Sequence, residues 1–90
     1  MEQGAAVKPV RLTNHARQQC RERGASEAEV VGAVREGVRE PAKAGRILRR
    51  YNYPFGALWQ GSCYSIKQVA PVIREEPGEI VVITVYTFYF

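Results

Sequence analysis

The first part of the chain carries two stretches of helical periodicity. In the first stretch, small apolar residues recur every four positions and share one stripe of a helix: Leu12, Ala16 and Cys20. Thr13 and Asn14 both make good N-caps, and Gly24 is a residue type that commonly ends a helix. The pattern predicts a helix over residues 15–23 that can lie close against a sheet.

A second helical stretch follows almost at once. Ser26 and Glu29 have the spacing of a capping box, in which each residue caps the other's backbone. Valines then repeat at helical spacing and form a second apolar stripe: Val30, Val31, Val34 and Val38. Gly37 and Pro41 are expected to end this helix. Because the connection is short, we expect the two helices to be neighbours that bury their stripes against a third element.

After Pro41 the pattern changes from helical to extended. β-branched and aromatic residues gather in four segments that we predict as strands: residues 46–53, 57–60, 64–73 and 80–88. Residues 10–12 are predicted to form a further brief strand or turn. The expected fold class is α+β, with two N-terminal helices packed on one face of a three- to four-stranded antiparallel sheet. Residues 1–9 are predicted to be a flexible tail and residues 10–90 a single domain.

Three details of the predicted sheet follow from residue type. Pro71 cannot donate to a strand ladder, so we expect it at a sheet edge or a bulge. The turn from Glu76 to Glu79 has Pro and Gly at its centre, as a type II turn prefers. Strict alternation divides the last strand between two faces, with Val81, Ile83 and Val85 on one and Val82, Thr84 and Tyr86 on the other.

Composition is typical of a soluble globular domain. Hydrophobic residues make up 46% of the chain and charged residues 24%, which argues against disorder. No apolar run approaches the roughly 20 residues needed to span a bilayer. Residues 1–7 lack the charged head and apolar stretch of a secretion signal. We therefore expect a cytoplasmic protein with no membrane partner.

Few side chains are available to hold a metal or a cofactor. The chain has a single His, no Asp, and two cysteines without C-x-x-C spacing. We therefore expect no metal site and no cofactor. Cys20 and Cys63 are both expected to be structural, since a buried free thiol behaves as a small hydrophobe.

Charge points more directly toward a partner. Thirteen Lys and Arg residues against nine Glu residues give a net charge of +4. Most of the cations are Arg, whose planar guanidinium suits bidentate contacts to phosphate or carboxylate. RNA, a ribosome or an acidic protein is a plausible partner on this ground. The alternative is a soluble surface that happens to be basic.

His15 is the one side chain in the sequence that titrates unaided near neutral pH. Metal-free RNA cleavage needs a base, an acid and cations around the phosphate. His15 is a candidate for proton transfer, Arg23 for bracing the phosphate, and Tyr86 for an acid or a hydrogen bond. The structural alternative gives His15 a hydrogen bond to the helix cap or a strand carbonyl. The alternative for Arg23 is an anchor across the helix–sheet junction, to a carboxylate or to carbonyls.

A candidate RNA-binding set comes from the strands: Arg46, Arg49, Arg50 and Thr84. Alternation places Arg46 and Arg50 on one face with Leu48, and Arg49 on the opposite face. The arginines can form a phosphate-binding patch, and the alternative is a solvated basic strand.

Aromatic residues are numerous for a chain of this length, at 10%. Bases stack on such side chains in RNA-binding proteins, and the same side chains anchor protein interfaces. Phe88, Tyr89 and Phe90 have little neighbouring chain to cover them, so they form a candidate interface. The expected partner is a second copy of the chain or an antitoxin-like protein.

Three segments, in this order, resemble one bacterial family. They are residues 14–16 (NHA), 21–30 (RERGASEAEV) and 82–86 (VITVY). The set resembles the family of domains of unknown function numbered 4258, which is similar in layout to RelE/ParE-type toxins and small barnase-like ribonucleases. The chain departs from the family pattern at Gln19, where many members carry Arg. It also lacks the second His that some members carry on a middle strand, so a two-histidine mechanism is excluded.

Two functions remain as hypotheses. The resemblance implies a small toxin-like protein, a metal-independent endoribonuclease that acts on mRNA, with His15 and an arginine facing a common cleft. The alternative is a non-catalytic module that binds protein or nucleic acid through a basic, aromatic sheet face.

Overall fold

The computed structural model describes residues 7–90. Residues 1–6 of the predicted tail therefore lie outside the described residues. A five-stranded sheet forms the framework, in the order β1-β5-β4-β3-β2. Its strands are β1 (Val10–Leu12), β2 (Val38–Pro41), β3 (Ile47–Trp59), β4 (Ser62–Glu75) and β5 (Ile80–Tyr89). β1 runs parallel to β5, and every other neighbouring pair is antiparallel.

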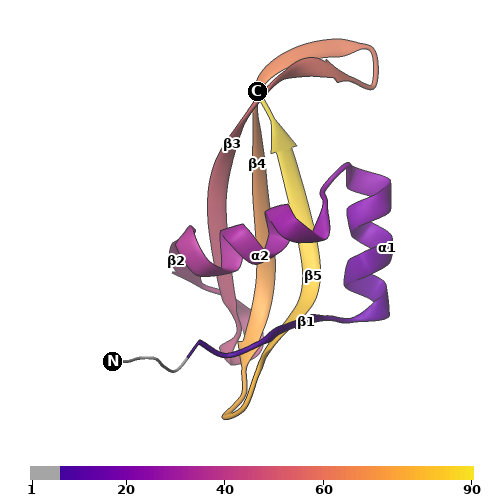
Figure 1. The fold of residues 1–90 in the computed structure, drawn as a ribbon. Helices are drawn as coiled ribbons and strands as arrows, with labels where there is room; N and C mark the ends of the chain where they lie inside the picture. Colours follow the sequence, from indigo (N-terminus) through magenta and orange to yellow (C-terminus); the bar gives the residue numbers. More distant parts are fainter. Residues whose placement is uncertain (1–6) are drawn as a thin grey trace.

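The predicted α+β class with two helices on one face is confirmed, while the predicted strand count and purely antiparallel order are wrong. Helix α1 (Asn14–Arg23) packs on β5, and helix α2 (Glu27–Glu36) crosses β3 and β4 (Figure 1). The brief strand predicted at residues 10–12 is present as β1, and the sheet gains one further short strand, β2, of four residues. A strand as short as β2 carries too few residues for a periodic signal.

Local capping chemistry sets the helix ends as the sequence predicts. The Thr13 hydroxyl accepts a hydrogen bond from the Ala16 amide at 3.1 Å and caps α1. Gly24 ends this helix in the left-handed conformation, with φ of 77°. Ser26 and Glu29 form the reciprocal capping box of α2, with both bonds at 3.0 Å.

The core lies between the helices and the sheet. Eleven buried residues form it: Leu12, Ala16, Cys20, Ala25, Val30, Ala33, Val34, Val69, Ile73, Val82 and Val85. The prediction that Val38 extends the buried stripe of α2 is wrong, because this residue is 68% exposed. The helix ends at Glu36 and the backbone turns extended at Gly37, so Val38 begins β2 instead.

Pro71 lies in β4, the central strand of the sheet, so its predicted place at an edge is wrong. Its side chain is fully buried. The paired register between β3 and β4 passes from Leu48 opposite Val72 to Tyr51 opposite Val69, which leaves Pro71 outside the paired positions. The ladder is interrupted at that point, and this lets the central strand accept a residue without an N–H.

A bulge in β5 overturns the strict alternation predicted for the last strand. Val72 lies opposite Thr84 and Ile73 opposite Val82, so Ile83 is an extra residue on β5. The extra residue turns Val85 to the same side as Val82, and both belong to the core beneath the helices.

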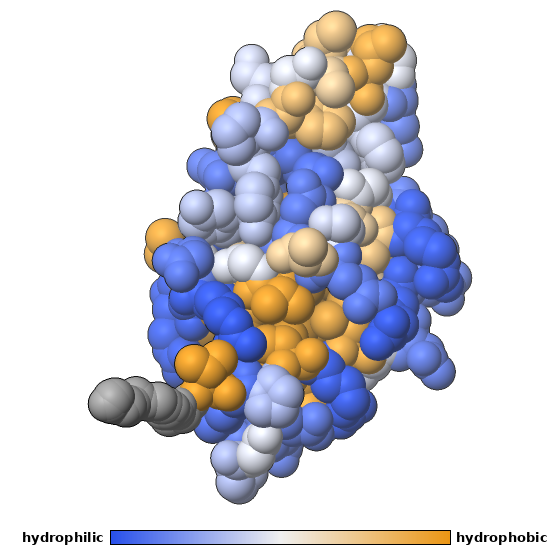
Figure 2. Space-filling model, viewed as in Figure 1, coloured by the Kyte–Doolittle hydropathy of each residue, from blue (hydrophilic) through white to orange (hydrophobic). Residues whose placement is uncertain are grey.

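The turns also differ from prediction. The strands predicted separately over residues 46–53 and 57–60 form one continuous strand, β3, with a bulge between Pro54 and Ala57. The chain reverses instead at Gln60 and Gly61, whose φ values of 50° and 86° suit a type I′ hairpin. The hairpin between β3 and β4 projects beyond the helices, and hydrophobic surface gathers at its end (Figures 1 and 2). A turn does form at Pro77 and Gly78, but Gly78 lacks the positive φ of the predicted type II turn.

Candidate functional site

One face of the sheet carries both helices, and no helix or strand of residues 7–90 covers the other face, called here the uncovered face (Figure 1). Arg46, Leu48 and Arg50 of the β3 region lie on the uncovered face, as alternation predicts: Arg46 and Leu48 line a groove there, and Arg50 bonds Gln68. Arg49 lies on the helix side, where its Nε donates to the Gly37 carbonyl at 2.9 Å. The predicted division of the three arginines is therefore confirmed.

A groove of about 410 Å³ crosses this uncovered face. It is lined by residues from β3, β4, β5 and the short 3₁₀ segment before β3: Ala42, Lys43, Arg46, Leu48, Val72, Thr84 and Tyr86. Leu48 and Val72 supply an apolar surface, while Thr84 and Tyr86 supply hydroxyl groups. The groove therefore combines cations, an aromatic ring and hydroxyls along one side of the sheet.

The cations of the groove differ from most others on the surface. Arg11, Arg39 and Arg50 each pair with a glutamate. Within residues 7–90, the side chains of Lys43 and Arg46 have no hydrogen-bond or ion-pair partner. Their charges are uncompensated by the described chain, and both face the same groove.

Arginines also lie against the two exposed aromatic rings of β5. The Arg23 guanidinium carbon lies 5.2 Å from the centre of the Tyr86 ring, and that of Arg50 lies 5.5 Å from the centre of the Phe88 ring. Tyr86 and Phe88 are each 42% exposed, so ring surface remains accessible. The uncovered face is thus basic and aromatic, which is the kind of surface that the hypothesis of a non-catalytic binding module expects.

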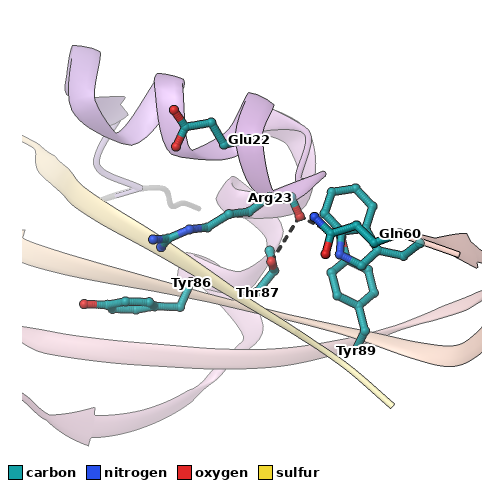
Figure 3. A pocket seen from close by; sticks show the side chains of 7 residues that line it. Glu22, Arg23, Gln60, Tyr86, Thr87 and Tyr89 are labelled. Atoms are coloured by element: carbon teal, nitrogen blue, oxygen red, sulfur yellow. Dashed lines mark hydrogen bonds between the residues drawn. The ribbon is translucent and has the colours of Figure 1, made fainter. Parts of the chain in front are cut away.

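Arg23 joins the end of α1 to β5. Its guanidinium donates to the Val85 carbonyl at 2.7 Å, and its own carbonyl accepts from the hydroxyls of Thr87 (3.0 Å) and Tyr89 (2.6 Å). Figure 3 shows the guanidinium extending toward Tyr86 and away from Gln60. The alternative role of Arg23, an anchor to carbonyls across the helix–sheet junction, is therefore confirmed. Burial raises the pKa of Tyr89, which keeps its hydroxyl protonated as a donor.

A second hollow, of about 230 Å³, lies beside this junction (Figure 3). Its lining comes from the end of α1, the β3–β4 hairpin and β5: Glu22, Arg23, Trp59, Gln60, Tyr86, Thr87 and Tyr89. Trp59 stacks on Tyr89, with ring centres 4.8 Å apart. Arg23 and Tyr86, two of the three catalytic candidates, therefore meet at this hollow.

His15, the third catalytic candidate, lies apart from both hollows. It is exposed on α1 and belongs to the lining of neither. Arg23 lies eight positions further along the helix, a rise of about 12 Å. Thr13, not His15, supplies the side chain that caps α1. The structure thus brings Arg23, Arg46, Thr84 and Tyr86 near one face and leaves His15 and Arg49 elsewhere.

Two contributors to this region carry no recognisable signal in the sequence. Lys43 lies in a short 3₁₀ turn and joins the groove because the chain folds back before β3. Gln19 is 8% exposed, and its Oε1 accepts from the Val85 amide at 2.8 Å and from the Thr84 hydroxyl. The family pattern draws attention to Gln19 as a departure, but not to this role.

The candidate interface residues at the end of β5 fall on two sides. Phe88 and Phe90 are 42% and 56% exposed. Tyr89 points to the helix side, where it contacts Trp59 and bonds the Arg23 carbonyl. Phe88 and Phe90 therefore remain available for contacts, while Tyr89 serves the fold.

The remaining features of residues 7–90 concern membrane-spanning helices, metal sites and the two cysteines. No helix there is long and apolar enough to cross a membrane, and no cluster of three His, Cys, Asp or Glu side chains is placed to hold a metal. Cys20 is buried, which raises the pKa of its thiol, whereas Cys63 is exposed on the hairpin.

Comparison with curated proteins and with solved structures gave no match. A family model does match, and it covers residues 12–87. That span runs from the last residue of β1 through both helices to β5, so it includes nearly every element described above. The chain therefore belongs to the family described as "Domain of unknown function (DUF4258)".

Proposed function

We propose that this domain binds single-stranded RNA on the uncovered face of its sheet. One observation carries the proposal: Lys43 and Arg46, whose charges have no partner within residues 7–90, face the same groove as Tyr86 and Thr84. Cations that lack protein partners are available to neutralise phosphates.

Each part of the groove matches one part of a nucleotide. Lys43 and Arg46 suit the phosphate, and the Tyr86 ring suits stacking of a base. The Tyr86 hydroxyl suits a hydrogen bond to a ribose 2′-hydroxyl or a base edge, and the Thr84 hydroxyl, whose proton goes to Gln19, can accept a bond from a ribose 2′-hydroxyl. Single-stranded RNA fits better than a duplex, because only unpaired bases can leave their stack for an aromatic side chain.

The test is fluorescence anisotropy with a labelled single-stranded RNA at several salt concentrations. Arg46→Ala should weaken binding about tenfold and lower the slope of log affinity against log salt by about 0.7, the value for one phosphate contact on a single strand. Tyr86→Ala should weaken binding by about 1–3 kcal/mol without changing the salt slope. Arg21→Ala is the matched control: Arg21 is the third described cation without a partner, and it lies exposed on α1, away from the groove. Equal losses for Arg21→Ala and Arg46→Ala would reject the groove as the binding site.

A second proposal is the toxin-like, metal-independent endoribonuclease, with a RelE/ParE-like layout and an antitoxin-like protein as partner. It is favoured by the Tyr86 hydroxyl beside two unpaired cations, since these groups could act on a bound phosphate. It is weakened by the distance of His15 from the groove, which leaves no histidine for proton transfer there. Two helices followed by three long antiparallel strands support the RelE/ParE-like layout.

Incubation of RNA with the purified protein in EDTA separates the two proposals. Binding without cleavage, on free RNA and on translating ribosomes, would favour the binding module. Cleavage that Tyr86→Phe abolishes would favour the nuclease at the groove, and cleavage that His15→Ala abolishes would place the chemistry on α1. Absence of both binding and cleavage would reject both proposals.

A further inference from the structure

The final part of β5 presents an open main-chain edge. Phe90 exchanges both of its backbone bonds with Ile66 of β4, so its N–H and C=O face into the sheet. Those of Val85 face the opposite way, toward the side chains of α1. Alternation then directs the N–H and C=O of Thr87 and Tyr89 outward, away from β4.

Helix α1 covers this edge only as far as Val85. Gln19 accepts from the Val85 amide, and Arg23 donates to the Val85 carbonyl, so the two side chains replace a neighbouring strand at that residue. Earlier on β5, the strand β1 and Thr13 perform the same task. Within residues 7–90, the backbone N–H and C=O of Thr87 and Tyr89 have no such partner.

The opposite edge of the sheet is protected in a way that β5 is not. Beyond the short strand β2, the free part of β3 contains Pro54 and a bulge between Pro54 and Ala57. Proline, bulges and charged side chains are the usual means by which natural sheets block pairing at an edge. The last part of β5 and the residue after it (residues 84–90, TVYTFYF) contain no proline, no charged side chain and no bulge.

We propose that two copies of this chain pair edge to edge through β5, antiparallel about a twofold axis at Phe88. Thr87 then lies opposite Tyr89 of the partner subunit, and the two residues exchange N–H···O bonds in both directions. Centring at Phe88 brings both outward-facing residues into bonded pairs and leaves Val85, already bonded to α1, outside the pairing. The two sheets become one continuous sheet.

The side chains favour a second copy over an unrelated strand. In this register Phe88 lies beside Phe88 of the partner subunit, and Tyr86 lies beside Phe90 of the partner subunit. Three exposed large hydrophobic residues of β5, at 42%, 42% and 56% exposure, thereby cover one another on the uncovered face. Residues 84–90 carry no charged side chain, so no like charges face each other along the paired strands themselves. The inference does not depend on RNA binding. The two grooves lie on one face of the joined sheet, and Tyr86 takes part both in its groove and in the pairing.

The first test is the mass in solution, measured by light scattering after size exclusion from about 1 µM to about 1 mM protein. The wild type should reach twice the monomer mass of 10.1 kDa. Phe88→Lys should remain a monomer, because it places two ammonium groups side by side on the axis. Thr87→Pro should also remain a monomer, because it removes an outward N–H that no described residue uses. Leu58→Lys is the control with equal change of charge, at a hairpin residue that is 67% exposed, and it should still dimerise.

A cross-link tests the register itself. Phe88 occupies a non-hydrogen-bonded pair on the axis, where the Cβ atoms approach to about 4.5–5.5 Å and a disulfide can form after a small adjustment. In a Cys63→Ser background, Phe88→Cys should oxidise to a covalent dimer, and Leu58→Cys should not.

Three results would overturn the proposal. They are a wild type that stays monomeric over the whole range, a dimer that survives Phe88→Lys, and a failure of Phe88→Cys to cross-link. Circular dichroism confirms that each variant is folded, and if Thr87→Pro unfolds, Phe88→Lys decides the question.

Discussion

Replacement of Gln19 by leucine isolates the contact through which α1 completes the edge of β5. Leucine has a similar size and removes the acceptor while it leaves the helix intact. Two hydrogen bonds disappear, from the Val85 amide at 2.8 Å and from the Thr84 hydroxyl. The Val85 amide is buried and has no other partner within residues 7–90, so it would be left unsatisfied.

The expected cost follows from these contacts. An unsatisfied buried donor costs about 1–3 kcal/mol, and the added apolar burial of leucine offsets part of the loss. We expect the free energy of unfolding to fall by about 2 kcal/mol. For a domain of this size, that corresponds to a fall of about 8–16 °C in the melting temperature.

Gln18→Leu is the matched control, since Gln18 lies next to Gln19 but is exposed and bonds only Glu22 within α1. Its effect should stay within about 0.5 kcal/mol. Thermal melts at one fixed protein concentration provide the comparison, because self-association makes the melting temperature depend on concentration. Amide exchange should also accelerate at Val85 in Gln19→Leu. Equal melting temperatures for the two variants would refute the role assigned to Gln19.

Three further predictions concern the rest of the fold. Gly24→Ala should lower the free energy of unfolding by about 2 kcal/mol in urea titrations, because φ is 77° and a Cβ would lie 2.6 Å from the Tyr89 hydroxyl. Gly78→Ala is the control and should be nearly neutral, because a Cβ there would have no atom within 4 Å. Lys67→Met should lower the free energy of unfolding by about 2 kcal/mol, measured by calorimetry, because the buried ammonium donates to the Gly24 carbonyl at 2.7 Å and lies 2.9 Å from the Glu29 carboxylate. A variant as stable as the wild type would contradict this. Hydrogen bonds from Arg39 and Arg11 hold the pKa of Glu75 and Glu79 below the usual 4.5. The two ion pairs therefore stabilise the folded state above pH 4.5, and this stabilisation is lost as the pH falls through the lower pKa of the folded state. Glu75→Gln with Glu79→Gln should therefore flatten the fall in melting temperature between about pH 5 and about pH 3, and an unchanged slope would argue against both pairs.

The parts of the fold that the sequence predicts are those fixed by neighbouring residues. Thr13, Gly24 and the Ser26–Glu29 pair act on backbone groups within a few positions, so their residue types and spacing carry the information. Alternation likewise assigns Arg46, Arg49 and Arg50 to the correct faces, because no bulge interrupts that part of β3.

What the sequence does not predict depends on pairing between distant segments. The extra residue Ile83 exists only relative to β4, and it reverses the expected faces of Val82 and Val85. Pro71 is tolerated in a central strand because of a local gap in the ladder, which residue type alone does not reveal.

The candidate site shows the same limit. Thr84 and Tyr86 are recognisable from their positions on the last strand, but Lys43 joins them only through the path of the chain before β3. His15 attracts attention by its chemistry, yet the orientation of α1 leaves it exposed and apart from the groove. Residue chemistry therefore identifies candidates, and tertiary packing decides which of them meet.

The central claim is that the uncovered sheet face binds single-stranded RNA at the groove. Amide chemical shifts of ¹⁵N-labelled protein, recorded during titration with a short single-stranded RNA, test it most directly. The account predicts the largest changes around Lys43 and Arg46 and at Thr84 and Tyr86, with little change along the exposed side of α1 that carries His15 and Arg21. Changes confined to α1 and α2, or none at saturating RNA, would contradict it.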